Sequence, residues 1–82
     1  MGEHVDLLPT TYLAIAEREG IGQTPFADTP VLIRDYLEEW CKDNVKGRWR
    51  LSNISIDHRL AFRFVFQKKR EAVRFKLIWG GQ

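Results

Sequence analysis

Hydrophobic and polar residues follow one spacing in the first half of this chain and another in the second half. Before Gly47 the apolar residues recur every three or four positions, as they do along one face of an α-helix. After Gly47 apolar and polar residues alternate, which is typical of strands with one buried face. The pattern therefore predicts an α+β protein in which helices precede strands.

Two helices are predicted in the first half. The first covers residues 10–19 and ends at Gly20, a residue type that suits the left-handed position after a helix. The second begins at Asp28 or Thr29, both of which can cap a helix start, and ends near Gly47. The second helix carries one apolar stripe, formed by Ile33, Leu37, Trp40 and Cys41.

Three strands are predicted in the second half. A tight turn at Asp57-His58 sets Leu51 opposite Phe64, and a second, longer turn sets Phe64 opposite Phe75. Both registers place the large apolar residues on the same side of the sheet, and a slip of one residue would reverse a face. We therefore expect two helices packed on one face of a three-stranded antiparallel sheet, in the order α-α-β-β-β.

The last predicted element has an alternative. A helix beginning near Glu71 would place Ala72, Phe75 and Trp79 on one face, so residues 70–79 could form a C-terminal helix. Large apolar residues occupy every second position from Val73 to Trp79 without a break, and this spacing favours the strand.

Length and cysteine content limit the class of protein. The chain has 82 residues, and we expect a single domain over residues 1–82 with a loose N-terminal tail over residues 1–8. Cys41 is the sole cysteine, so no internal disulfide can form, as is usual in a reducing cytosol. No apolar run approaches the ~18 residues of a membrane span, and the N-terminus lacks the basic segment of a signal peptide. A cytoplasmic protein without membrane contact is predicted.

Charge is distributed unevenly along the chain. Residues 1–45 carry a net charge of −6 and residues 46–82 a net charge of +8. In the predicted sheet, five cationic side chains project from the face opposite the helices. These candidate binding residues are Arg48, Arg50, Arg63, Arg74 and Lys76. Such a face predicts electrostatic attraction to an anionic partner, and arginine forks suit carboxylates or phosphates.

The kind of partner is narrowed by the aromatic residues. They all point toward the predicted helices, so the exposed face offers no platform for stacking bases. An acidic surface of a protein is preferred over duplex nucleic acid, because the acidic helices would repel a nucleic acid that wraps around so small a domain. Contact with duplex phosphates is the alternative, and a homo-oligomer stays open.

Candidate catalytic groups are few. Cys41 lies on the apolar stripe, where a structural thiol is expected. Asp57 and His58 could orient a general base, but they occupy a predicted turn with no nucleophile nearby. Four carboxylates spread over the outer face of the second helix: Asp35, Glu38, Glu39 and Asp43. No metal-ligand spacing or phosphate-binding glycine loop is present, so a non-enzymatic interaction module without metal or cofactor is predicted.

The C-terminal third carries the pattern Phe66-x5-Ala72-x2-Phe75-x-Leu77-x-Trp79. This pattern spans about 14 residues, its defined positions are apolar, and it resembles the C-terminal pattern of some small phage-encoded accessory proteins. The resemblance implies a phage origin and a host macromolecule as partner, whose activity such proteins often inhibit or redirect. It brings no catalytic residue with it.

Overall fold

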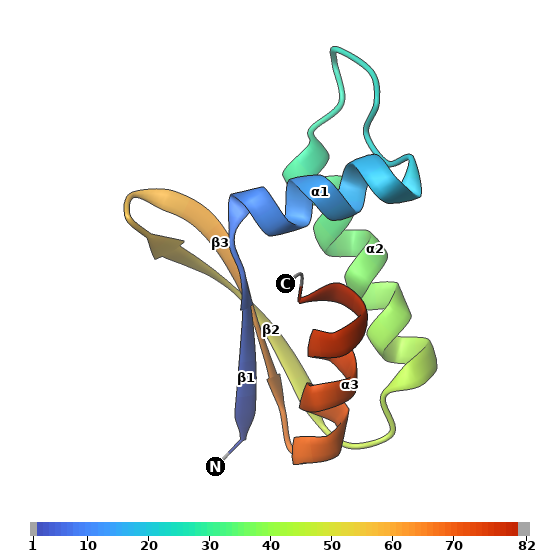
Figure 1. Cartoon of the computed structure of the whole chain (residues 1–82), viewed down its shortest axis with the longest axis vertical. Coiled ribbons are helices and arrows are strands. Elements are labelled where there is room, and N and C mark those ends of the chain that lie inside the picture. Colours follow the sequence, from blue (N-terminus) through green and yellow to red (C-terminus); the bar gives the residue numbers. More distant parts are fainter. Residues whose placement is uncertain (1, 81–82) are drawn as a thin grey trace.

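The computed structural model describes residues 2–80 and shows an α+β fold (Figure 1). The elements in chain order are β1 (Glu3–Leu7), α1 (Pro9–Glu19), α2 (Thr29–Asn44), β2 (Trp49–Ile56), β3 (Arg59–Phe66) and α3 (Lys69–Trp79). The strands form one antiparallel sheet in the order β1-β3-β2. All three helices lie on one face of this sheet, so its other face is open.

The β2–β3 hairpin matches the predicted register. Leu51 pairs with Phe64, as the turn at Asp57-His58 required. Both turn residues have positive φ angles, 52° at Asp57 and 65° at His58. Two consecutive residues of this kind form the tight turn whose twist fits a hairpin. The prediction for the first two strands is therefore confirmed.

The third strand of the sheet is β1, which comes from the N-terminus. The prediction of a loose tail over residues 1–8 is wrong, because Glu3–Leu7 pairs along β3 with Val5 opposite Phe64. Val5 and Leu7 are buried beneath the helices. Two apolar positions are a weak signal in sequence. In the fold, however, they lie beside the apolar residues of β3, the central strand.

The last element is helix α3, so the strand predicted for residues 73–79 is wrong and the helical alternative is confirmed. Both periodicities fit this segment. Its apolar residues lie two positions apart, as in a strand, and also three or four positions apart, as on one face of a helix. The edge of β3 that a C-terminal strand needs is taken by β1. As a helix, the segment buries Ala72, Phe75 and Trp79, and leaves Leu77 82% exposed.

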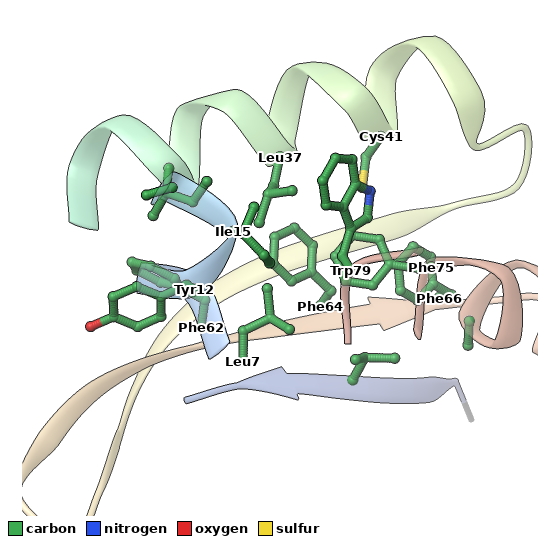
Figure 2. Close-up of a cluster of buried hydrophobic side chains, with 14 residues drawn as sticks. Leu7, Tyr12, Ile15, Leu37, Cys41, Phe62, Phe64, Phe66, Phe75 and Trp79 are labelled. Carbon is green, nitrogen blue, oxygen red and sulfur yellow. The ribbon is translucent and has the colours of Figure 1, made fainter. Parts of the chain in front are cut away.

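The core lies between the open sheet and the three helices (Figure 2). Phe75 of α3 packs on β3, with its ring centroid 4.6 Å from Phe64 and 5.2 Å from Phe66. Trp79 meets Trp40 of α2 edge to face at 5.9 Å. The predicted contact between Phe64 and Phe75 thus exists, although a helix and not a strand provides it.

The two N-terminal helices agree with the predicted ones to within a few residues. Helix α1 ends at Gly20, which has a φ of 71°. Helix α2 buries Ile33, Leu37 and Cys41 of the predicted stripe, while Trp40 is half-buried against α3. Within residues 2–80, every helix is too short or too polar to cross a bilayer.

Candidate functional site

The structure separates the five cationic residues predicted to share one face. Arg48 and Arg50 lie at the start of β2, and Arg63 lies in β3 on the open face of the sheet. Arg74 and Lys76 lie in α3, within the helical layer on the other side. The prediction of one basic sheet face is therefore wrong for Arg74 and Lys76, because it required residues 73–79 to be a strand. The register of β2 and β3 keeps Arg50 and Arg63 on the same, open face.

Arg63 is paired with a carboxylate that the sequence analysis assigned to the tail. Its Nε and Nη2 atoms donate hydrogen bonds to Asp6 at 2.8 and 2.9 Å. The hydrogen bond from Arg63 holds the pKa of the Asp6 carboxyl below its usual value, against the opposing effect of burial. The pair crosses from β3 to β1, so the charge of Arg63 is neutralised within the sheet.

Arg74 also has partners within the fold. Its guanidinium lies 5.6 Å from the centre of the Trp40 ring. It also donates hydrogen bonds to the carbonyl oxygen and side-chain oxygen of Asn44, at 3.5 and 3.4 Å. These contacts join α3 to the end of α2, which gives Arg74 a packing role.

Two connections meet at one end of the molecule and bring other cations together. The connection from α2 to β2 lies against the turn from β3 to α3, at the lower end of Figure 1. The backbone N–H of Gln67 donates to the carbonyl of Arg48 at 2.9 Å. We call this region the basic end, and its residues are Lys46, Arg48, Arg50, Lys68, Lys69 and Arg70.

Glu71 holds the two connections of the basic end together. Its carboxylate accepts hydrogen bonds from the backbone N–H groups of Lys46 at 2.7 Å and Gly47 at 3.1 Å. The hydrogen bond from Lys46 is the main reason why the pKa of Glu71 lies below its usual value. Gly47 fits here because a Cβ would lie only 2.9 Å from a Glu71 carboxylate oxygen. Glu71 thereby positions the cations of one connection beside those of the other.

The basic end carries a concentrated positive charge. All six cationic residues are exposed. Within residues 2–80, none of them forms an ion pair with a carboxylate. Lys68, Lys69 and Arg70 also lie at the N-terminus of α3, where the helix dipole is positive and further cations are destabilising. An anion at this end would relieve both kinds of repulsion.

Shallow hollows flank the basic end on two sides. One, on the open side of the sheet, is lined by Gly2, Arg48, Trp49, Arg50, Val65 and Gln67. The other, between the helices, is lined by Asn44, Lys46, Arg70, Glu71 and Arg74. Trp49 is half-buried and packs against the core, so only part of its ring reaches the first hollow. The surface therefore presents cations over a broad, shallow area.

The sequence analysis missed four of the six residues. Its candidate binding residues included Arg48 and Arg50 but left out Lys46, Lys68, Lys69 and Arg70. Three successive cations between two structured segments were a usable signal. What the pattern did not contain was the contact that brings Lys46 beside this run, because Glu71 makes it through backbone groups.

The groups considered for catalysis have structural surroundings. Cys41 is completely buried, and burial raises the pKa of its thiol to about 12. Asp57 and His58 form the hairpin turn at the other end of β3. On α2, Glu39 accepts a hydrogen bond from Lys42 at 3.1 Å.

Fold and site together define a small α+β domain with one open sheet face and a cationic end. No protein-family model, curated protein or solved structure matches the chain. The resemblance to phage accessory proteins stays a prediction.

Proposed function

We propose that this protein is a non-enzymatic binding module that contacts the phosphate backbone of a nucleic acid through its basic end. One observation carries the proposal. Six exposed cations, from two connections and the adjoining ends of β2 and α3, have no ion-pair partner among residues 2–80 and are gathered at one end of the fold. Lysine and arginine side chains in this arrangement can each contact a phosphate and release counterions.

The composition of the basic end supports phosphates over an acidic protein surface. Stable protein interfaces contain apolar or aromatic anchors at their centre. Here the fully exposed aromatic residue, Phe26 at 98%, lies in the connection between α1 and α2, away from the basic end. The earlier preference for a protein partner assumed that nucleic acid would wrap around the acidic helices. A cationic end allows contact without wrapping.

The contact is expected to be independent of base sequence. Trp49 lines the hollow beside Arg48 and Arg50, and its half-buried ring packs against the core. It therefore does not offer a free face for base stacking. Four to six phosphate contacts would give a slope of about −4 to −5 for log affinity against log salt.

The test compares two double variants by fluorescence anisotropy with a short, labelled, random-sequence duplex. Arg50→Gln with Lys69→Gln removes two charges from the basic end. Arg59→Gln with Lys76→Gln removes the same charges from exposed positions away from the basic end. We expect the first pair to weaken binding at least about tenfold and to reduce the salt slope by about 2. The control pair should change affinity about twofold or less.

The outcomes separate the proposal from its main rival. Equal losses in the two double variants would show that net charge, and not the basic end, determines binding. If the wild-type protein does not bind the duplex but binds polyglutamate at the basic end, the partner is an acidic protein. Thermal melting of both variants is the control for folding. Both should have the melting temperature of the wild type, because the changed side chains are exposed.

A further inference from the structure

Among residues 2–80, strand β1 has one edge without a partner strand. It pairs with β3 on one side, and the sheet order β1-β3-β2 leaves its other side free. A free edge presents backbone N–H and C=O groups that can pair with another strand. Its residues Glu3–Leu7 contain no proline or lysine, two of the devices that commonly block such pairing.

The helix beside β1 carries apolar residues in solvent. Helix α3 turns Ala72, Phe75 and Trp79 toward the core, and the adjoining flank contacts α2. On the part of α3 turned away from both, Val73 is 48% exposed and Leu77 is 82% exposed. These residues are one helical turn apart, so they form a continuous apolar strip. Such a strip is unusual on the solvent side of a helix.

We propose that two copies of this chain form a dimer by antiparallel pairing of their β1 strands. The two-fold axis passes beside Val5, and the two sheets join into one of six strands. The α3 helices of the two copies then lie side by side across the axis. Val73 and Leu77 of each copy contact the other copy there. The occupant of the free edge is thus a second copy of the same strand.

The charges of β1 select this register. In a joined sheet, the core-facing residues of one copy must lie opposite core-facing residues of the other. The register can therefore shift only by two residues at a time, because a shift by one would place core-facing residues opposite residues of the open face. With Val5 opposite itself, His4 of one copy lies opposite Asp6 of the other, and an imidazole N–H can donate to the carboxylate. The two neighbouring allowed registers set His4 opposite His4 or Asp6 opposite Asp6, which are unfavourable like pairs.

The placement of the basic ends also favours this dimer. Residues Lys68–Arg70 lie near the Glu3 end of β1, because Glu3 pairs with Phe66 at the end of β3. Antiparallel pairing therefore puts the two basic ends at opposite ends of the dimer. The other edge strand, β2, begins after Arg48 and contains Arg50, and the side chain of its Asn53 accepts a hydrogen bond from Arg34 of α2 at 3.1 Å. That edge is more polar and more cationic.

Sedimentation equilibrium tests the apolar part of the interface. The wild type is expected to dimerise, and Val73→Glu is expected to be monomeric. Val31→Glu is the matched control, because Val31 is 47% exposed at the start of α2, outside the interface. This control should dimerise like the wild type. A wild type that stays monomeric up to about 1 mM, or equal effects of the two variants, would overturn the proposal.

Oxidative cross-linking tests the register. An equimolar mixture of the single variants His4→Cys and Asp6→Cys should form a disulfide between the two variants, because these positions are directly opposite. His4→Cys alone should not, since its two copies would be diagonal and more than about 7 Å apart between Cα atoms. Buried Cys41 does not compete for oxidation. Cross-linking of His4→Cys alone, or none in the mixture, would exclude this register.

Discussion

Phe64 occupies the centre of the core. Its side chain is completely buried, and its strand pairs it with Val5 on one side and Leu51 on the other. Phe64→Ala is expected to lower the free energy of unfolding by about 3–5 kcal/mol, because the cavity cannot close between two strands and α3. Phe26→Ala, at a 98% exposed position, should change it by about 0.5 kcal/mol or less. Denaturant melts of both variants check this, and similar midpoints would contradict the described core.

His58 is held in an unfavourable backbone conformation. Its φ of 65° follows a φ of 52° at Asp57, and only glycine adopts this region without steric cost. His58→Gly gives the preferred Asp-Gly turn. We expect a net stabilisation of roughly 0.5–1 kcal/mol. This is the relief of backbone strain in the folded state minus the cost of the greater conformational entropy that glycine gives the unfolded chain. A rise in melting temperature checks the prediction, and Ser52→Gly within β2 should have the opposite effect.

Among the elements, the two connections of the basic end depend on Glu71. Glu71→Gln should lower the melting temperature at pH 7, because a neutral amide accepts the hydrogen bonds of Lys46 and Gly47 more weakly. The folded pKa of Glu71 lies below its usual value of 4.5. The stabilisation is therefore present above about pH 4.5 and is lost as the pH falls through the folded pKa.

The pH dependence distinguishes this explanation from a packing defect. The difference in melting temperature between wild type and Glu71→Gln should shrink as the pH falls below 4.5. Asp6 also has a lowered pKa, so the wild type loses stability from both groups in acid. Asp6 is present in both proteins, and its effect cancels in the comparison. A difference that stays constant down to pH 3 would rule out the Glu71 carboxylate as the source of this stabilisation.

The elements differ in how far the sequence determines them. The β2–β3 hairpin was predictable because apolar alternation and a two-residue turn both specify the same register. For residues 69–79, two apolar periods coincide, and the choice of helix depends on β1 filling the edge of β3. Strand β1 has few apolar residues, so only its tertiary partner reveals it. The same holds for the basic end: the sequence shows its cationic residues, but only the tertiary structure shows that they lie at one end of the fold.

On the scale of the whole molecule, Gly2, the first residue that the structure describes, lies beside the basic end. Gly2 lines the same hollow as Arg48 and Arg50, whereas Gly80 follows the opposite end of α3. A neutral protein domain fused to the N-terminus should therefore weaken binding to duplex nucleic acid, because it covers the cations. The same domain fused to the C-terminus should have a smaller effect. Anisotropy titrations of both fusions check this, and equal affinities would place the contact elsewhere.

The position of β1 has a consequence for how the protein folds. Asp6 and Arg63, which join β1 to β3, are 57 positions apart in the chain. During translation β1 leaves the ribosome first, but it cannot pair until β3 has also been made. By contrast, β2, β3 and α3 follow one another in the chain and can pack on one another as they appear. Closing so long a loop is entropically costly, so β1 is expected to dock late. A strand that docks late also detaches readily. In the monomer, for which the Val73→Glu variant serves, hydrogen exchange should then be faster at the amides of β1 than at those shared by β2 and β3.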